Sequence, residues 1–418
     1  MDHADCYFPV TECRICKGQN MKLYLDLGKI PLVNNYVAPA EAQQDDPRFP
    51  LQLLFCNDCT LSQLSIVVSP ETLYTNYLYR SSISKTFVGH CYAFAKHSVN
   101  TFDLSRQSLV VDIASNDGCA LNEFKKFGVR VLGVEPAQNL ADIAQKNGIT
   151  TFVGFWNEDT ARQILAQHGE ASFISAMNVF AHVHDIHAFL KAVRLLLKDQ
   201  GVFVIEVPYL LNFVNKNEFD TIYHEHLSYF LVKPLSHLIQ QHGMEIFDIK
   251  KFVIHGGSIR VYVKKTTNKY LSIDQDSIQW LLELEKDLKL YEVETYVNFS
   301  RDVEKLSQEL VKLLLRLKKQ GKIIAAYGAS AKGSVLTNFC RIGNAVISYI
   351  IDDTPEKQGY LAPGTHIPIV PPSYLREKEP DYLLLLAWNF ADELMQRTQE
   401  YKNRGGKYII PIPNVRIV

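Results

Sequence analysis

The pattern of hydrophobic and polar positions divides the chain into segments of different periodicity. Residues 1–75 are rich in turn-forming residues and show no sustained helical period. From about residue 107, short runs of β-branched residues alternate with helical stretches, a pattern typical of a parallel, doubly wound sheet. The strands predicted for this sheet cover residues 108–114, 129–135, 149–153, 171–178 and 201–207.

The second half of the chain repeats this alternation after a helical segment. Residues 275–318 carry leucines and charges at helical spacing without Pro or Gly, which predicts one or two long helices that bridge domains. Further strands are predicted at 322–327, 345–351, 382–386 and 407–410. The expected fold class is α/β, with a small N-terminal zinc-binding domain (1–75), a central Rossmann-like domain (76–270), and a helical linker with a second, C-terminal Rossmann-like domain (271–418).

Composition and charge narrow the class of protein. The chain has 44 Lys plus Arg against 45 Asp plus Glu, a net charge of −1, so no general attraction to nucleic acid is expected. Its hydrophobic fraction of 47% is that of a soluble globular protein. The N-terminus is acidic and lacks an apolar signal region, and no stretch reaches the roughly 18 apolar residues of a spanning helix. We therefore expect a cytoplasmic protein without a membrane partner.

Two Cys-x-x-Cys pairs stand in the first 60 residues. Cys13 and Cys16 are followed, after 39 intervening residues, by Cys56 and Cys59. Four thiolates on two tight turns satisfy a tetrahedral Zn²⁺ with no open position, so the pairs predict a structural zinc site. Free thiols, a redox pair and an iron–sulfur cluster are the alternatives.

A buried strand runs into a turn of small residues at 112–118. The turn contains Asp112, Ala114, Ser115, Asn116 and Gly118, and Glu135 ends the next predicted strand. An acidic side chain there can accept hydrogen bonds from ribose hydroxyls. Since the Gly-x-Gly-x-x-Gly fingerprint is absent, a ligand with a ribose but no phosphate, such as S-adenosylmethionine, fits better than a dinucleotide. An ordinary α/β turn with a surface Glu is the alternative.

A cluster of titratable residues occupies 219–229. Tyr223, His224, Glu225 and His226 are consecutive and follow the predicted strand at 201–207, at the edge where α/β sheets place their ligands. His-x-His can bind a metal, but the sequence favours acid–base chemistry, with one His as base and Glu225 or a Tyr fixing its tautomer.

Two weaker features complete the set. Residues 77–82 lie where the first two domains meet, so Tyr77 or Tyr79 can reach a cleft or serve only in packing. Residues 327–333 follow a strand and open a helix, where backbone N–H groups and Lys332 can hold a phosphate; a plain helix cap is the alternative.

Taken together, these segments resemble the sugar C-methyltransferase family of deoxysugar pathways. The resemblance covers nearly the whole chain and rests on the four cysteines and on residues 77–82, 112–118, 178–182, 223–226, 255–260 and 327–333. It implies an S-adenosylmethionine-dependent enzyme with structural zinc, whose substrate is a nucleotide-linked 4-keto-6-deoxy sugar methylated at C-3. The histidine that ends the Tyr-His-Glu-His run, His226, corresponds to the base.

The resemblance also implies roles for other residues. The catalytic set is His226, Glu225, Tyr223, Tyr79 and Tyr77. The cofactor-binding set is Asp112, Ala114, Ser115, Asn116, Gly118, Glu135, Pro136 and Asn178. The substrate-binding set is His182, His224, His255, Arg260, Tyr327 and Lys332.

Three other functions remain open from the sequence. An RNA methyltransferase with a zinc-ribbon binding domain predicts basic residues around the cysteines, but 42–58 has few. A non-catalytic nucleotide-sugar-binding protein predicts no cofactor binding. A nicotinamide oxidoreductase lacks its glycine fingerprint. The hexose, the nucleotide, the stereochemistry and the oligomeric state are not determined by the sequence.

Overall fold

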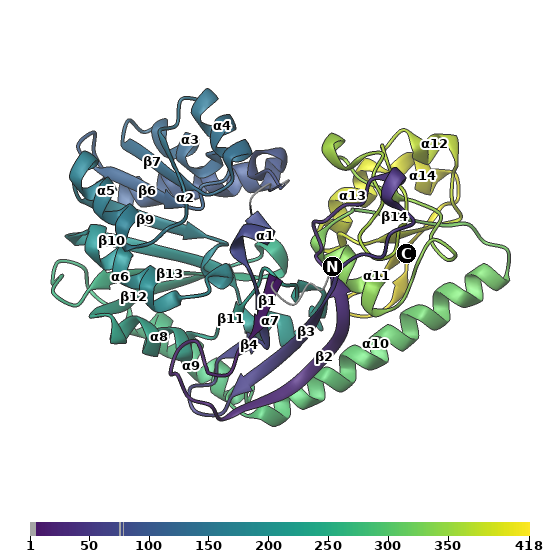
Figure 1. The fold of residues 1–418 in the computed structure, drawn as a ribbon, viewed down its shortest axis with the longest axis horizontal. Helices are drawn as coiled ribbons and strands as arrows, with labels where there is room; N and C mark the ends of the chain where they lie inside the picture. Colours follow the sequence, from purple (N-terminus) through teal and green to yellow (C-terminus); the bar gives the residue numbers. More distant parts are fainter. Residues whose placement is uncertain (1–5, 75–76, 78) are drawn as a thin grey trace.

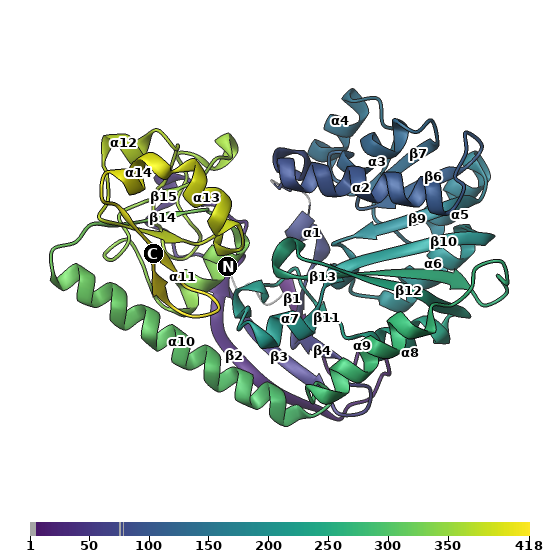
Figure 2. The same ribbon diagram turned by 180° about the vertical axis from the view of Figure 1, so that it is seen from behind.

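Two α/β lobes face each other above an N-terminal sheet and a long helix (Figures 1 and 2). The structure is a computed structural model that describes residues 6–74, 77 and 79–418. The side chain of His255, predicted to contact substrate, lies outside the described part. Among the described residues, no helix combines the length and apolarity needed to cross a membrane.

The N-terminal block is built on an antiparallel sheet that the turn-rich sequence did not predict. Its order is β11-β4-β3-β2. The bounds are β2 (Met21–Pro31), β3 (Arg48–Cys56), β4 (Ser62–Leu64) and β11 (Ser228–Tyr229). In β3, Phe49, Leu51, Leu53 and Phe55 are buried at every second position, which is the period of a strand with one face on a core. Outside this sheet, β1 (Tyr7–Pro9) pairs with β5 (Ile66–Val68), and α1 (Pro70–Tyr74) follows.

The central lobe contains a seven-stranded sheet of order β12-β13-β10-β9-β6-β7-β8. Its five parallel strands match the predicted ones: β6 (Leu109–Ile113), β7 (Arg130–Glu135), β8 (Thr151–Val153), β9 (Ala171–Met177) and β10 (Leu197–Pro208). Two antiparallel strands, β12 (Met244–Phe252) and β13 (Ser258–Lys265), were not predicted. Since the chain leaves β6 toward β7 and returns on the other side as β9, the ligand-binding switch point lies at the ends of β6 and β9.

Helices cover both faces of this sheet (Figures 1 and 2). Their bounds are α2 (Lys85–Thr101), α3 (Cys119–Lys125), α4 (Gln138–Lys146), α5 (Glu158–His168), α6 (Ile186–Leu196) and α8 (Val232–Gln241). Helix α7 (Leu210–Asn215) lies instead beside the N-terminal sheet and the long helix, where Phe213 contacts the rings of Tyr229 and Phe299. A parallel sheet needs such cover because both of its faces are apolar.

The predicted helical linker forms two helices, α9 (Gln275–Asp287) and α10 (Val293–Lys319). Lys289, with φ of 55°, breaks the helical path between them. The 27 residues of α10 extend about 40 Å. Its apolar stripe, which includes Phe299, Leu306 and Leu314, is buried, and the helix runs below both lobes (Figure 1).

The C-terminal lobe is a second Rossmann-like unit of six strands, in the order β16-β15-β14-β17-β18-β19. The bounds are β14 (Ile324–Tyr327), β15 (Ile350–Ile351), β16 (Ile369–Val370), β17 (Tyr382–Leu385), β18 (Lys407–Ile410) and β19 (Arg416–Ile417). The helices are α11 (Ala331–Phe339), α12 (Tyr374–Glu377), α13 (Ala391–Arg397) and α14 (Gln399–Asn403). The strand predicted at 345–351 is wrong over its first five residues, because Val346 and Ile347 belong to a turn before β15.

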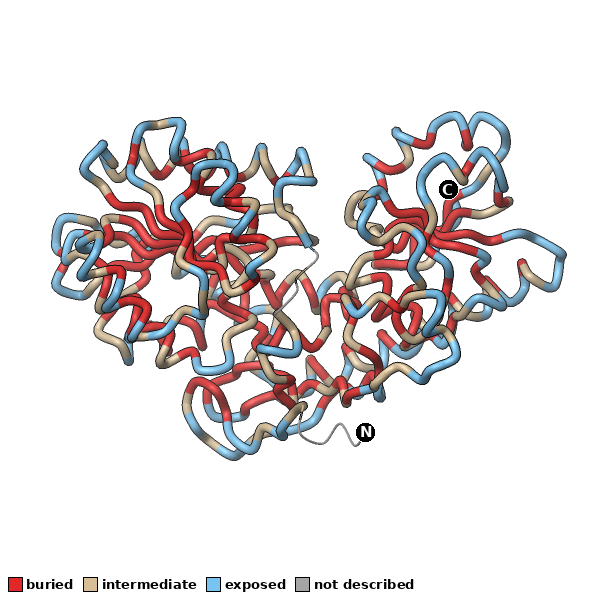
Figure 3. Tube along the Cα trace, turned by 45° about the horizontal axis from the view of Figure 1, so that its top comes forward, coloured by how far each residue is buried: buried red, intermediate tan, exposed pale blue. Residues whose placement is uncertain are grey.

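Buried segments concentrate in the strands of both lobes (Figure 3). One cluster of buried apolar side chains is nevertheless continuous through the N-terminal sheet, the central sheet, α10 and the C-terminal sheet; it includes Leu53, Ile205, Leu310 and Leu384. The lobes are therefore held by a shared core as well as by the linker.

Candidate functional site

The four cysteines of the N-terminal block lie together. Cys13 and Cys16 follow β1, Cys56 ends β3, and Cys59 lies in the turn after it. The Sγ atoms of Cys13 and Cys59 are 3.4 Å apart and those of Cys16 and Cys56 are 3.6 Å apart. All four sulfurs lie within 4.8 Å of one another. Zn–S bonds of about 2.3 Å in a tetrahedron place sulfurs about 3.8 Å apart, so the thiols fit a structural zinc ion.

Arg14, between the first two cysteines, connects this cluster to residues 223–226, the predicted acid–base motif. Its side chain is buried, and Nη1 donates to the carbonyls of Leu227 (3.1 Å) and Leu64 (3.4 Å). Strand β11, just after the motif, also pairs with β4. The zinc-binding turns therefore support residues 223–229 directly.

The turn after β6 has an unusual backbone. Ala114, Asn116 and Gly118 have φ of 54°, 55° and 79°, so three of five residues are left-handed. The Glu135 carboxylate closes the turn: Oε2 accepts from the Asn116 N–H (2.8 Å) and Oε1 from the Ala137 N–H (2.9 Å). Pro136, between these contacts, continues the chain from β7 toward α4. Burial raises the pKa of Glu135, although the two N–H groups oppose the shift.

Orphaned polar atoms at the same edge fit a bound adenosyl group. The Ser115 Oγ and the Asn178 Oδ1 are buried without a hydrogen-bond partner among the described residues. Asn178 follows β9 with φ of 56°, and its N–H donates to the Glu206 carbonyl (2.8 Å). Buried polar groups are normally paired, so these atoms are suited to a ligand with donors such as ribose hydroxyls or an amino group.

Asp112, at the end of β6, is buried and accepts a hydrogen bond from the Ser175 Oγ (2.6 Å). Burial raises its pKa to about 7. Because the folded-state pKa exceeds the unfolded value of about 3.9, Asp112 lowers the stability of the ligand-free protein increasingly as pH rises from about 4 to 7.

We therefore expect Asp112→Asn, which keeps an acceptor for Ser175, to raise the thermal midpoint relative to the wild type more at pH 8 than at pH 5. Thermal unfolding of both proteins at the two pH values measures this. A difference in midpoint that does not change with pH would show that Asp112 is not held neutral by burial.

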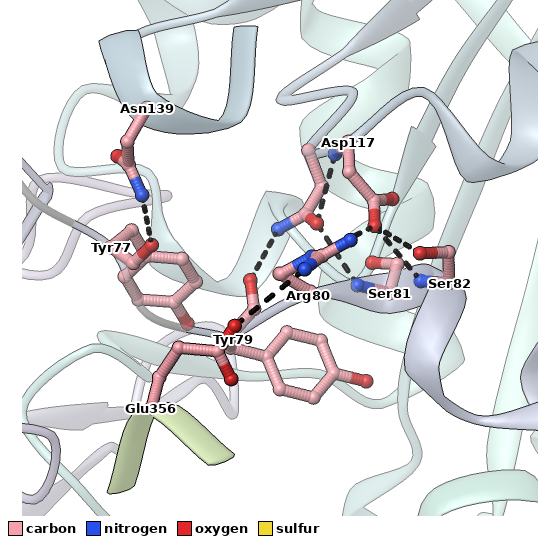
Figure 4. A network of polar contacts seen from close by, with 9 residues as sticks. Tyr77, Tyr79, Arg80, Ser81, Ser82, Asp117, Asn139 and Glu356 are labelled. Carbon is pink, nitrogen blue, oxygen red and sulfur yellow. Dashed lines mark hydrogen bonds and ion pairs between the residues drawn. The ribbon is translucent and has the colours of Figure 1, made fainter. Parts of the chain in front are cut away.

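Residues 77 and 79–82 lie on the switch-point turn (Figure 4). The Asn139 side chain of α4 donates to the Tyr77 carbonyl (2.9 Å), and that of Asn116 donates to the Tyr79 carbonyl (3.0 Å). Asp117 accepts from the Ser82 Oγ (2.5 Å) and from its N–H (3.2 Å).

The same segment reaches the C-terminal lobe. Arg80 extends from it to Glu356, with 3.6 Å between Nη1 and Oε1 (Figure 4). The side chain of Tyr79 is exposed, whereas the Tyr77 hydroxyl donates to the Glu225 carboxylate (2.8 Å). Of the two tyrosines, Tyr77 thus contacts the acid–base motif.

His226 lies in a cluster of aromatic and titratable side chains. It is buried, and its Nδ1 lies 2.8 Å from the Thr221 carbonyl, which requires the proton on Nδ1. The ring centroids of Tyr223 and His182 lie 3.9 Å and 4.9 Å from that of His226. Burial lowers the pKa of His182 to about 4 and raises that of Tyr223 well above its usual value, so both are neutral near pH 7.

Glu225 is held from two domains. Its Oε1 accepts from the Asn34 side chain (2.6 Å), which comes from the N-terminal block, and Oε2 accepts from Tyr77. Burial raises the pKa of Glu225 to about 7. A carboxyl group of this kind can exchange a proton near neutral pH.

A short segment of chain links Asn178 to the His226 cluster. Asn178 follows β9, and the 3₁₀ helix η4 (Phe180–His182) begins two residues later. His182 thus lies four residues after Asn178 and packs on His226. The Tyr74 hydroxyl lies 3.4 Å from the His182 Nδ1 and adds another phenol to the cluster.

Two residues predicted to bind substrate have structural partners instead. The His224 Nε2 lies 3.2 Å from the Pro50 carbonyl, so His224 anchors the motif on β3. Arg260 is buried in an ion pair with Glu206 (2.6 Å), and its guanidinium lies between the rings of Phe94 and Phe252. Neither side chain joins the His226 cluster, because His224 contacts the Pro50 carbonyl and Arg260 pairs with Glu206. The local sequence does not reveal these partners.

Lys332 and Tyr327 lie on the C-terminal lobe. The Lys332 Nζ is 3.7 Å from a Glu218 carboxylate oxygen, and the Tyr327 hydroxyl donates to Asp353 (3.1 Å). In the predicted phosphate loop, the Ser330 side chain caps α11 by accepting from the Gly333 N–H (3.1 Å). The cap occupies one of the backbone N–H groups at the start of this helix.

Sequence reasoning missed Asn34, Tyr74, Arg14 and Trp388, and it gave Asp220 no role of its own within the cluster at 219–229. Asn34 contacts Glu225 across 191 positions of sequence, and Trp388 contacts Asp220 across 168. No local pattern predicts such pairs; the two polar residues Asn34 and Asn35 stand out only because apolar residues flank them.

Comparison with known families and proteins agrees with this architecture. Family models match residues 13–74 (a zinc binding domain), 90–248 (a methyltransferase domain) and 253–413 (a C-methyltransferase C-terminal domain). The C-methyltransferase NovU of Streptomyces niveus is 34% identical over 414 residues, which cover 99% of this chain and 98% of that protein.

More distant similarity covers less than half of the chain in the following two proteins. The ubiquinone biosynthesis O-methyltransferase of Bartonella quintana is 22% identical over 174 residues, which cover 38% of this chain and 68% of that protein. The magnesium protoporphyrin IX methyltransferase of Synechocystis, a solved structure, is 12% identical with a TM-score of 0.33 and covers 43% of this chain and 83% of that one. The full-length match and the three domain matches show that the chain belongs to the C-methyltransferase family and is an S-adenosylmethionine-dependent methyltransferase with an N-terminal zinc-binding domain.

Proposed function

We propose that this enzyme methylates C-3 of a nucleotide-linked 4-keto-6-deoxy sugar, with His226 as the base. The observation that carries the proposal is the buried imidazole of His226, whose Nδ1–H donates to the Thr221 carbonyl and whose ring packs on His182, four residues after Asn178. Family membership supports transfer to carbon, and carbon methylation needs such a base.

The chemistry explains why. S-adenosylmethionine supplies an electrophilic methyl group, which a ring carbon can attack only after it loses a proton. A ketone at C-4 makes the proton at C-3 acidic enough to be removed. The hydrogen bond from Nδ1 to Thr221 makes Nε2 the basic nitrogen of His226, and it holds the ring in one orientation. A positioned base of this kind contributes about 10²- to 10⁴-fold in rate.

The surrounding phenols suit the enolate that forms. Burial raises the pKa of both Tyr77 and Tyr223 well above the usual value, so each keeps its proton and can donate to an oxygen that becomes negative. Glu225, held by Asn34 and Tyr77, is placed to orient these groups or the sugar. Neutral His182 packs on His226 without adding a competing positive charge.

The cofactor is expected at the left-handed turn. Glu135 is proposed to accept from the ribose, with Asp112, Ala114, Ser115, Asn116, Gly118, Pro136 and Asn178 around the adenosyl group. The orphaned atoms of Ser115 and Asn178 and the acceptor capacity of Glu135 support this assignment.

Incubation with labelled S-adenosylmethionine and a panel of dTDP-, GDP- and CDP-linked 4-keto-6-deoxy sugars tests the function. We expect label in at least one sugar, with a new methyl signal on C-3 in the NMR spectrum. A parallel incubation with RNA tests the alternative that the enzyme is an RNA methyltransferase. Label in RNA and none in any sugar would contradict the proposal.

Replacement of Glu135 by Gln tests the cofactor site. The carboxylate now accepts hydrogen bonds from two backbone N–H groups. The amide would turn its own NH₂ group, a donor, toward one of them, and it would offer the ribose one acceptor fewer. Since a hydrogen bond to a charged group is worth about 1.5–3 kcal/mol, we expect the Kd for S-adenosylmethionine to rise at least about tenfold.

Titration calorimetry measures this Kd. Glu158→Gln, on the partly exposed start of α5, is the matched control and should bind as the wild type does. Equal affinity of Glu135→Gln and the wild type would remove Glu135 from the cofactor site.

A further inference from the structure

The short 3₁₀ helix η5 (Phe219–Thr221), which precedes the acid–base motif, packs against the C-terminal lobe. The Phe219 ring lies edge-on to that of Phe339 in α11, with centroids 5.3 Å apart. Asp220 is fully buried, and its Oδ2 accepts a hydrogen bond of 2.6 Å from the Trp388 Nε1–H. Trp388 opens the 3₁₀ helix η8 (Trp388–Phe390), which follows β17. The C-terminal lobe therefore holds η5 through one ring contact and one hydrogen bond.

This contact is adjacent to the atom that orients the base. The Thr221 carbonyl, which accepts from the His226 Nδ1, belongs to the residue after Asp220. In η5, the Thr221 N–H donates to the Glu218 carbonyl (3.0 Å) and the Ile222 N–H to the Phe219 carbonyl (3.0 Å), so the turn moves as a unit. A rotation of η5 would change the direction of the Thr221 carbonyl and, with it, the imidazole.

The hydrogen bond from Trp388 matters because the indole N–H is a direct donor to the buried Asp220 carboxylate, whose ionised form is otherwise favoured by the charge of Lys332. The Asp220 Oδ1 is buried without a hydrogen-bond partner among the described residues. A buried carboxylate that loses its donor must relax toward another one or take up a proton. The indole also stacks under Lys332, whose Nζ lies 4.8 Å from the ring and 3.7 Å from a Glu218 oxygen. The ring packing and the N–H donor are thus two separable properties of Trp388.

We propose that Trp388 is a positioning residue for the base, through which the C-terminal lobe fixes the imidazole of His226 by way of Asp220 and the Thr221 carbonyl. The inference rests on the proposed role of His226. It gives the C-terminal lobe a part in the proton-transfer step, apart from any contact that this lobe makes with the nucleotide.

Replacement of Trp388 by Phe keeps an aromatic ring and removes the N–H group. Since small misplacements of catalytic groups can cost about 10²-fold, we expect the rate constant for solvent exchange of the C-3 proton at saturating sugar to fall about 10- to 100-fold. The KM for the sugar and the Kd for S-adenosylmethionine should stay near the wild-type values, and the thermal midpoint should fall by no more than the few degrees expected for one lost buried hydrogen bond. Trp280→Phe, on the exposed face of α9, is the matched control and should leave exchange unchanged.

A second variant keeps the test decisive if Trp388→Phe is poorly folded. Asp220→Asn weakens the acceptor without changing its size, so it should slow exchange and shift the Trp388 indole N–H signal in a ¹⁵N–¹H spectrum. The chain has three tryptophans, so the Trp388 signal is assigned as the one that persists in both Trp156→Phe and Trp280→Phe.

The outcomes separate the two proposals. Wild-type exchange in folded Trp388→Phe, or an indole signal that Asp220→Asn leaves in place, overturns the positioning role alone. A parallel fall in exchange, cofactor affinity and thermal midpoint also overturns it, because that pattern is one of general destabilisation. Absence of exchange in the wild-type enzyme overturns the proposed function itself.

Discussion

Replacement of His226 by Asn is expected to lower turnover by at least about 10²-fold while the Kd for S-adenosylmethionine stays within about twofold of the wild type. The Asn side chain can still donate to the Thr221 carbonyl, so the local fold is kept, but it has no basic nitrogen to take the C-3 proton. The cofactor turn at 114–118 does not depend on His226 for any hydrogen bond in the described structure. Steady-state rates and titration calorimetry measure the two quantities.

His237→Asn provides the control for this variant. His237 is an exposed histidine of α8 whose ring is bonded to Gln241 in the same helix, so its loss should leave the rate unchanged. Full turnover in His226→Asn would remove this residue from the mechanism. Loss of cofactor binding together with turnover would instead indicate that His226 has a structural role.

Loss of the zinc site is expected to have the second large effect. In Cys56→Ser one of four ligands is replaced by a hydroxyl group, and zinc-dependent folding energies of about 10 kcal/mol are typical of such sites. We expect the purified variant to contain less than one equivalent of zinc and to unfold at a clearly lower temperature than the wild type. Metal analysis and thermal unfolding check both points.

Loss of the zinc ion should also lower the turnover of the enzyme, because the zinc-binding turns support the acid–base motif at 223–226. Arg14 donates to the Leu227 carbonyl, β4 pairs with β11, and Asn34 holds Glu225. Cys6→Ser, which changes a cysteine outside the cluster, should leave zinc content and turnover intact. Wild-type turnover in zinc-free Cys56→Ser would show that the N-terminal block is not needed for the site.

The fold was predicted where local pattern decides it. The five parallel strands of the central sheet are apolar runs between helices, and each was found within a few residues. Strand β12 alternates charged and apolar residues, for example Glu245, Ile246 and Asp248, and it pairs antiparallel with β13. Buried parallel strands are continuous apolar runs, so a search for such runs does not find a strand that contains charged residues. In the N-terminal block, β2 and β3 pair with each other across the long loop at 32–47. The turn-forming residues therefore determined the sequence-based prediction, and the two strands were not found.

The sequence indicates the candidate site residues but not the contacts that support them. The four cysteines, His226, Glu225 and the turn at 112–118 stand out because unusual residue types cluster in short segments. Their partners come from distant segments: Tyr77 lies 148 positions from Glu225, and Trp388 and Asn34 are farther still. A buried histidine such as His224, bonded to the Pro50 carbonyl, looks the same in sequence as one that acts on a substrate. Only the tertiary fold separates these roles.

The central claim is that His226 removes a proton from C-3 before any methyl transfer, and one measurement addresses it most directly. The wild-type enzyme is incubated in D₂O with the sugar substrate and without S-adenosylmethionine, and deuterium at C-3 is followed by NMR. We expect enzyme-dependent exchange in the wild type and none above background in His226→Asn. Suppose that the wild-type enzyme methylates the sugar, but that deuterium enters C-3 at the same rate with the wild type and with His226→Asn. This result would contradict the account.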